Sequence, residues 1–399
     1  MICTIGIDLD IVEMSLDVIK FAINRITQTD PKLGFPRKAE ELHELVGETV
    51  TPKGIGGEKA FQLFRDVLLK ASVSIDHPRH LAFVPASPTR AAIMFDLVTS
   101  ASSIHGAYWL EGAGGIFAEN QAMEWLVSLT GMPEGSFGVF TSGGTSANLS
   151  AIVAARDDWR RKDESRLRTR GLIVASDEAH SSIKAMAKVI DTDVLRVPTS
   201  GCFVAEDLER EIAKLPAAEM DRIFAVIATA GTTNAGVVDD LSGIADICER
   251  MKVWFHVDAA YGGGALAAPS VRRLFDGIER ADSVTIDPHK WLFSPYDCGA
   301  VIYRRPEIAK LAHSQSGDYL DIFKGETHGF NPSDYQIQLT RRLRGLPLWF
   351  SLATHGTDRY TQAVERGIEL AQIAGDMIRK SPSVQLVREP SLSCVLYRR

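Results

Sequence analysis

Cysteine is scarce in this sequence, and long apolar runs are missing. The five cysteines among 399 residues include no Cys-x-x-Cys pair, so we expect neither a disulfide framework nor a zinc cluster. His77 and His80 have metal-ligand spacing but no third ligand beside them. No stretch approaches the roughly 18–20 apolar residues that span a bilayer, and Asp8 comes too early for a signal peptide. These absences predict a cytoplasmic protein with no metal site and no membrane partner.

An excess of positive charge is absent too. Lys and Arg number 44 against 51 Asp and Glu, which gives a net charge of −7 with both signs interspersed. Proteins that bind nucleic acid concentrate basic side chains on one face, so no nucleic-acid partner is expected. Hydrophobic residues make up 45% of the chain, enough for a large core. The length suits two or three domains.

From about residue 137 onward, short apolar segments alternate with helical patterns. Residues 171–175, 223–228 and 253–257 are nearly continuous apolar runs, which are typical of parallel strands covered on both faces. Residues 299–303 return as a further strand. The alternation predicts an α/β fold with a mostly parallel sheet and helices on both faces.

The same patterns divide the chain into three parts. Residues 1–85 show helical spacing and are expected to form an N-terminal helical segment. Residues 86–345 hold the strand–helix alternation, and 346–399 read as the start of a small C-terminal α+β domain. Within the large part, the Gly-rich stretch 111–115 is expected to be a turn between two helices.

Polar side chains follow four of the predicted strands directly. They are His180, Thr233, Asp258 and Lys290. The carboxyl ends of parallel strands meet at one edge of a sheet, where such folds bind their ligands. Each residue alone fits an ordinary core or turn position, but four polar groups at one edge predict a site.

Lys290 stands in a turn after a β-branched run and before Trp291, Leu292 and Phe293. Apolar surroundings disfavour the ammonium form and would lower the pKa of this lysine. A lysine amine freed in this way forms Schiff bases with aldehydes. The stretch alone fits a surface lysine after a turn equally well.

A short strand over 137–140 runs into Ser142-Gly143-Gly144-Thr145 and then into a helix. The free N–H groups and positive dipole end of a helix start bind phosphate. No Gly-Lys-Ser/Thr follows, so the stretch is not a nucleotide P-loop. An ordinary capped helix start remains the alternative.

A phosphate cradle, a Schiff-base lysine and a carboxylate together suit pyridoxal 5′-phosphate. Lys290 would take the aldehyde, and the helix start near Gly144 would take the phosphate. Asp258 would keep the pyridine nitrogen protonated, which makes the ring an electron sink. His180 is placed to stack on the ring, although a histidine here also fits a helix cap or the core.

The sequence resembles the fold-type I, group II pyridoxal-phosphate-dependent amino-acid decarboxylases, which include aromatic-amino-acid, tyrosine, histidine and glutamate decarboxylases. The resemblance runs from about residue 50 to the end and rests on five stretches. These are Gly143–Asn148, Ser176–Ser182, His256–Tyr261, Asp287–Trp291 and Thr340–Arg342. It implies a seven-stranded sheet and a homodimer with the site at the subunit interface. It also implies roughly 60–90 further residues after Arg399.

By the same resemblance, Lys290 carries the cofactor, His180 stacks on its ring and Asp258 pairs its nitrogen. The other implied contacts to the cofactor are Gly144, Thr145, Thr233, Ala260, Ser283 and His289. Where the family often has Asn, this chain has Asp287. A carboxylate would repel phosphate, so Asp287 is expected to point away or to accept a backbone hydrogen bond.

The resemblance also assigns a proton donor and a substrate pocket. Tyr319, in a loop over about 313–333, occupies the place of a mobile tyrosine that protonates the substrate carbon after carbon dioxide leaves. Related aldehyde synthases have phenylalanine there. Phe83 and Val84 stand where aromatic decarboxylases tend to have Tyr-Phe, which favours smaller or polar substrates.

We therefore expect a lyase that removes the α-carboxylate of an L-amino acid and gives the amine and carbon dioxide. Aldehyde synthesis and transamination on the same fold are the first alternatives. A catalytically silent relative is the second, and the presence of Lys290, Asp258 and His180 counts against it.

Overall fold

The computed structural model describes residues 9–84, 87–315 and 329–399, and the chain forms two compact units, 1–90 and 91–399. The helices of the first unit are α1 (Leu9–Thr27), α2 (Ala39–Val46) and α3 (Gly57–Leu63), the last continued by a π-helical turn over Phe64–Leu68. Within this unit the Phe21 and Phe61 rings meet edge to face at 5.5 Å. The described part of this unit is helical, and the predicted boundary at residue 85 stays a prediction.

The second unit is built on a seven-stranded sheet. Its strands are β1 (Phe137–Thr141), β2 (Leu172–Ser176), β3 (Asp193–Val197), β4 (Ile223–Thr229), β5 (Trp254–Asp258), β6 (Ser283–Ile286) and β7 (Gly299–Tyr303). Their order is β1-β7-β6-β5-β4-β2-β3. β7 runs antiparallel to both of its neighbours, and the other neighbouring strands pair in parallel. The predicted mostly parallel sheet is confirmed.

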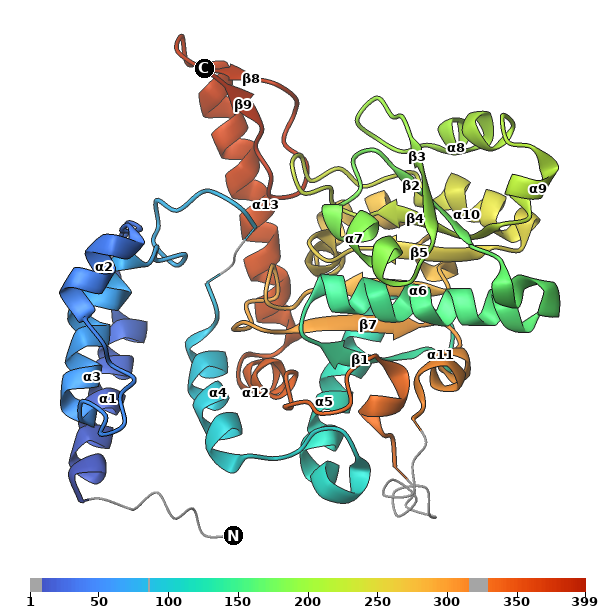
Figure 1. Cartoon of the computed structure of the whole chain (residues 1–399). Coiled ribbons are helices and arrows are strands. Elements are labelled where there is room, and N and C mark those ends of the chain that lie inside the picture. The colour runs from blue at the N-terminus through green and yellow to red at the C-terminus, as the bar shows by residue number, and fades with distance from the viewer. Residues whose placement is uncertain (1–8, 85–86, 316–328) are drawn as a thin grey trace. The chain divides into compact units, whose positions relative to one another are not determined.

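Helices cover this sheet, and one of them carries the start of the site. The helices are α4 (Arg90–Ser102), α5 (Trp109–Thr130), α6 (Gly144–Arg161), α7 (Ser181–Val189), α8 (Ala205–Ile212), α9 (Ala217–Met220), α10 (Leu241–Met251), α11 (Pro306–His313), α12 (Leu346–His355) and α13 (Thr357–Arg379). Figure 1 shows α6 lying across the strands, and it contacts β1, β4, β5, β6 and β7. With α7 and α11 it closes an apolar core around residues such as Ile152, Ile173 and Phe224.

The glycine-rich stretch 111–115 is not a turn, so that expectation is wrong. α5 runs through it, with one non-helical residue at Gly112 (φ −129°, ψ 21°). A Cβ at Gly112 would lie 2.6 Å from the His105 carbonyl oxygen, and one at Gly115 would lie 2.2 Å from Leu343. The glycines are there because the helix is packed closely, and not because the chain reverses.

After α13 the chain forms a small two-stranded sheet. β8 (Gln385–Leu386) pairs antiparallel with β9 (Tyr397–Arg398). These are the only strands that the structure describes after α13. Across the described ranges, no helix has the length and apolar character needed to cross a membrane.

A buried ion pair ties α5 to the segment before α12. Arg341 Nη2 lies 2.9 Å from Glu119 Oε2, and the two side chains are 0% and 3% exposed. Glu119 Oε1 also accepts the backbone N–H of Gly345 (2.7 Å), and Arg341 Nη1 donates to the Gly106 carbonyl (2.7 Å). Burial raises the pKa of Glu119, and the Arg341 charge opposes that shift. Each charge therefore depends on the other for its place in the core.

Replacing Arg341 with Met is expected to lower the free energy of unfolding by about 3–5 kcal/mol, because Glu119 would stay buried without its counter-charge. Arg342→Met is the matched control, since that side chain is 38% exposed where it pairs with Asp96. Its loss should cost less than about 1 kcal/mol. Urea denaturation of both variants measures the difference, and equal losses would contradict the assignment.

Candidate functional site

One cavity of about 350 Å³ lies where β2, β4, β5 and β6 end and α6 begins. Its lining residues are Ser142, Gly143, Gly144, Thr145, Ser146, Asn148, His180, Ser182, Thr229, Gly231, Thr233, Asp258, Ala260, Tyr261, Asp287, His289 and Lys290. His180, Thr233, Asp258 and Lys290 are all among them, as their positions after strand ends predict. Most of the lining residues have polar side chains, which suits a ligand with charged groups.

Asp287 is the nearest charged neighbour of Lys290. Its Oδ2 lies 3.1 Å from Lys290 Nζ and 3.8 Å from His289 Nε2. The expectation that Asp287 points away is wrong: the carboxyl lines the cavity, is 3% exposed, and its Oδ1 has no hydrogen-bond partner among the described residues. Burial raises the pKa of Asp287, and the Lys290 charge partly offsets this. The purely apolar surroundings expected for Lys290 are not found, since its side chain is also 27% exposed.

The start of α6 is open to an anion. Gly143 precedes it with φ +146°, no side chain caps the helix, and the Ser146 hydroxyl is buried without a hydrogen-bond partner. A Cβ at Gly144 would lie 2.9 Å from Asp287 Oδ2 and 3.0 Å from Ala260 Cβ. Free backbone N–H groups, an unsatisfied hydroxyl and missing side chains together form a cradle for a phosphate-sized anion.

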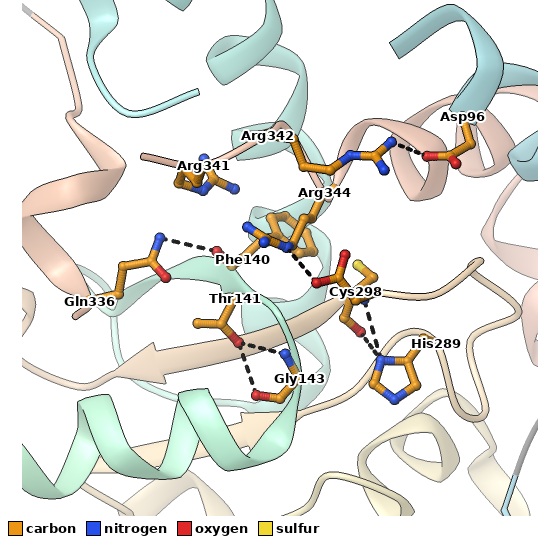
Figure 2. A network of polar contacts seen from close by, with 12 residues as sticks. Asp96, Phe140, Thr141, Gly143, His289, Cys298, Gln336, Arg341, Arg342 and Arg344 are labelled. Carbon is orange, nitrogen blue, oxygen red and sulfur yellow. Dashed lines mark hydrogen bonds and ion pairs between the residues drawn. The ribbon is translucent and has the colours of Figure 1, made fainter. Parts of the chain in front are cut away.

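His289 is fixed beside this cradle by the backbone of Cys298. Figure 2 shows its ring next to Cys298, and also the Thr141 hydroxyl bonded to Gly143. His289 Nδ1 lies 2.7 Å from the Cys298 carbonyl oxygen, to which it donates a proton. Burial lowers the pKa of His289, so the ring is predominantly neutral with a lone pair on Nε2.

His180 is the residue before α7, and its side chain caps that helix. Its Nδ1 accepts the backbone N–H of Ser182 at 3.2 Å and lies 2.9 Å from the Ser182 hydroxyl. The neutral ring therefore carries its proton on Nε2. His180 thus caps the helix and also lines the cavity, and its stacking on a cofactor ring stays a prediction.

Asp258 ends β5 with its carboxylate held at both oxygens. Oδ2 accepts Asn148 Nδ2 at 2.8 Å, and Oδ1 accepts the Ala260 backbone N–H at 3.2 Å. The side chain is 5% exposed. The sequence motif Gly143–Asn148 contains this asparagine but predicts no role for it. Its position one helical turn after Gly144 is the signal that places it in the site.

Three of the expected site residues need separate comment. Ser283 does not line the cavity: it begins β6, is fully buried and contacts Trp254 and His256. The structure therefore does not bring Ser283 to the cavity, which lies at the other end of that strand. Phe83 and Val84 belong to the first unit, where Phe83 is 93% exposed, and their role stays a prediction. Tyr319 lies outside the described residues.

The cavity has a suitable partner for the aldehyde, the phosphate and the ring nitrogen of pyridoxal phosphate. Lys290 offers an amine for the aldehyde, and the cradle at Gly144 with the unsatisfied Ser146 hydroxyl suits the phosphate. The Asp258 carboxylate suits a protonated ring nitrogen. These three groups need different chemistry, and the cavity supplies all three.

Comparison with known proteins agrees with this chemistry. The model of the pyridoxal-dependent decarboxylase conserved domain matches residues 45–399. An aromatic-L-amino-acid decarboxylase of Bacillus atrophaeus is 31% identical, over 90% of this chain and 75% of its own length. An L-2,4-diaminobutyrate decarboxylase of Acinetobacter baumannii is 30% identical, over 90% and 74%.

The crystal structure of Oryza sativa TDC with PLP and tryptamine superposes with a TM-score of 0.90 at 25% identity. It covers 98% of this chain and 84% of that one. The predicted fold and cofactor are confirmed by these likenesses. On its sheet, its cavity and the match over residues 45–399, the chain belongs to the family of pyridoxal-dependent decarboxylases.

Proposed function

We propose that this chain removes the α-carboxylate of a small or polar L-amino acid, with Lys290 holding the cofactor and Asp258 pairing its ring nitrogen. The observation that carries this assignment is the meeting of Lys290, Asp258 and the open start of α6 in one cavity. Bound pyridoxal phosphate supplies an electron sink for the pair released when the Cα–carboxylate bond breaks. The reaction consumes one proton and gives the amine and carbon dioxide.

The side chains around the cavity divide the remaining work. The cradle at Gly144 and Thr145 binds phosphate, and His289, held by Cys298, flanks it. Thr233 and Ala260 line the wall beside the ring. His180, fixed by Ser182, stacks on the ring and keeps a proton on Nε2. Together these residues would hold the cofactor in one orientation in the cavity.

Tyr319 is proposed to donate the proton that Cα needs after carbon dioxide leaves. A phenol can act as a general acid toward this carbon, and a carbon that has been protonated no longer reacts with oxygen. Without that proton, oxygen and water would convert the same carbon to an aldehyde, with ammonia and hydrogen peroxide as co-products. This alternative activity is the one that a lost tyrosine would favour.

The substrate class is proposed from the side chains that replace aromatic ones. Phe83 and Val84 stand in place of a Tyr-Phe pair, and His105 and Ala107 in place of apolar residues. His105 Nδ1 lies 2.5 Å from Glu111 Oε2, so a polar pair joins the segment before α5 to the first turn of that helix. Relatives named for 2,4-diaminobutyrate and for cysteine sulfinic acid agree with a polar preference.

A homodimer is proposed as the working form. On α4, Met94, Leu97 and Val98 share one helical face and are 38%, 51% and 47% exposed. α5 adds Leu110 and Phe117, both more than half exposed. Apolar side chains grouped in this way favour association, and a second copy of the chain is the proposed partner.

The cytoplasm stays the predicted location, to be checked by cell fractionation.

The proposed reaction is tested by amine and carbon dioxide release from a panel of L-amino acids. We expect turnover of 2,4-diaminobutyrate or cysteine sulfinate to exceed that of tryptophan and tyrosine by at least tenfold (~1.4 kcal/mol of discrimination). Lys290→Ala should lose the visible cofactor band, its fixation by borohydride and nearly all turnover. A band that survives in Lys290→Ala would contradict the assignment of the lysine.

The same panel tests Tyr319 through its products. Tyr319→Phe should release carbon dioxide while amine falls and aldehyde and hydrogen peroxide rise. Tyr397→Phe is a suitable control, because that tyrosine on β9 is 56% exposed and does not line the cavity. If Tyr319→Phe forms only amine at the wild-type rate, another group delivers the proton.

Asp287→Asn is expected to tighten the binding of inorganic phosphate, because it removes a negative charge beside the cradle. Burial raises the pKa of Asp287, so the carboxyl becomes charged only as the pH rises through that raised value. The ratio of phosphate dissociation constants, wild type over Asp287→Asn, should therefore be near one at low pH. It should grow to roughly 3–10 toward higher pH, as expected for one partly screened charge pair.

Isothermal titration calorimetry over a pH series measures this ratio. Asp191→Asn, an exposed change before β3 at the opposite end of the strands, should leave it at one throughout. A ratio for Asp287→Asn that does not change with pH would show that this carboxyl does not act on the cradle.

The dimer is tested by light scattering at micromolar concentration. Wild type should have twice the chain mass of 43.7 kDa, and Leu97→Glu should shift it toward one chain because a charge would be buried in the interface. Leu370→Glu on α13, at a side chain that is 49% exposed, should not. A wild-type mass of one chain would refute the dimer.

A further inference from the structure

A line of hydrogen bonds runs from the sheet interior to the cavity. Trp254 Nε1 donates to Ser283 Oγ at 2.8 Å, and Ser283 Oγ lies 2.8 Å from His256 Nδ1. His256 Nε2 lies 3.0 Å from Asn148 Oδ1, and Asn148 Nδ2 donates to Asp258 Oδ2 at 2.8 Å. All five side chains are at most 5% exposed. We call these five residues the relay.

The fold explains why the relay forms. Trp254, His256 and Asp258 alternate along β5, so their side chains lie on the same face of the sheet. Ser283 is the register partner of His256 on the neighbouring strand β6. Asn148 comes from α6, which packs on that face. Three elements that are separate in the sequence therefore meet in one line.

An ionised Asp258 sets the direction of every bond in the relay. A carboxylate only accepts, so Asn148 presents its amide N–H to Asp258 and its oxygen to His256. His256 Nε2 must then carry the proton, and Nδ1 accepts from the Ser283 hydroxyl. The indole N–H of Trp254 can only donate, and it fills a lone pair of Ser283. No donor in this order faces another donor.

We propose that Asn148 and His256 are positioning residues that hold the Asp258 carboxylate ionised and oriented toward the pyridine nitrogen of the cofactor. The inference rests on the proposed pairing of Asp258 with that nitrogen. Hydrogen-bond donors to a carboxylate favour its charged form. Two donors to Asp258 are described, the Asn148 side-chain amide and the Ala260 backbone N–H. Without His256, the Asn148 amide could rotate and turn its oxygen toward the carboxylate.

A neutral His256 serves this purpose better than a charged one. Burial lowers the pKa of His256 to about 4, despite the opposing effect of Asp258. An imidazolium in the relay would compete with the ring nitrogen for the negative charge of Asp258. The neutral His256 ring fixes the orientation of the Asn148 amide without adding a positive charge near Asp258.

The test compares two cofactors that differ only at the ring nitrogen. Pyridoxal phosphate and its 1-deaza analogue share the aldehyde and phosphate, but the analogue has C–H where Asp258 would pair. Their dissociation constants for the full chain are measured by quenching of tryptophan fluorescence. Wild type should prefer pyridoxal phosphate by at least about tenfold, the scale of one charge-assisted hydrogen bond.

Asn148→Leu and His256→Phe should reduce this preference to less than about threefold, mainly by weakening pyridoxal phosphate. His256→Gln, which has both an acceptor and a donor, should restore most of it. Thr285→Val is the matched control. Thr285 is fully buried, is the register partner of Asp258, and its hydroxyl has no hydrogen-bond partner among the described residues. Its loss should leave the preference unchanged.

The outcomes separate the relay from the assignment on which it rests. A wild type that binds both cofactors equally overturns the pairing of Asp258, and the relay with it. A wild-type preference that survives in Asn148→Leu and His256→Phe overturns the relay alone. Equal weakening of both cofactors in the variants would show that these residues only support the fold, which also overturns it. If both variants fail to fold, histidine nitrogen NMR of the wild type decides, because a proton on Nδ1 of His256 contradicts the relay.

Discussion

A negative charge buried at the end of β5 is the constraint on which this structure depends most. Asp258 is 5% exposed, and an isolated carboxylate at such a place would take up a proton to avoid the cost of desolvation. Two hydrogen bonds reduce that cost, one from Asn148 and one from the Ala260 backbone. The first requires α6 to cross the sheet at this strand, and the second requires the chain to turn immediately after it. The needs of one carboxylate thus explain the placement of a helix and of a turn.

The two carboxylates of the cavity have opposite surroundings. Asp258 has a donor on each oxygen, whereas Asp287 has an ammonium beside one oxygen and no hydrogen-bond partner described for the other. Burial raises the pKa of Asp287, and Lys290 only partly offsets it. In active sites, two groups of the same type often have different pKa values because their surroundings differ. Here the surroundings give Asp258 two hydrogen-bond donors and give Asp287 a single close cation.

Much of the fold and of the site could be predicted from the sequence. Apolar strands such as 223–228 are long enough to identify without neighbours, and His180, Thr233, Asp258 and Lys290 follow strands whose ends must meet. The turn predicted at 111–115 is not formed. Its glycines are needed because His105 and Leu343 pack closely against the helix there, and no local sequence pattern shows such a contact. The sequence could not show that Ser283 faces away from the cavity, because a resemblance does not say which residues face the ligand. The prediction that Asp287 points away was wrong because it included only repulsion by a phosphate. The attraction of Lys290 holds the carboxyl in the cavity.

The direction of β7 has a mechanical consequence. Because β7 runs against its neighbours, it begins at the edge where they end, and Gly299 stands there between two parts of the site. A Cβ at Gly299 would lie 2.5 Å from Gly143 Cα and 2.7 Å from Asp287 Oδ1. The start of α6 and the turn that carries Lys290 would therefore both collide with a side chain at position 299. Only glycine leaves both in place, so a larger residue there would displace the phosphate cradle or the Asp287 carboxyl.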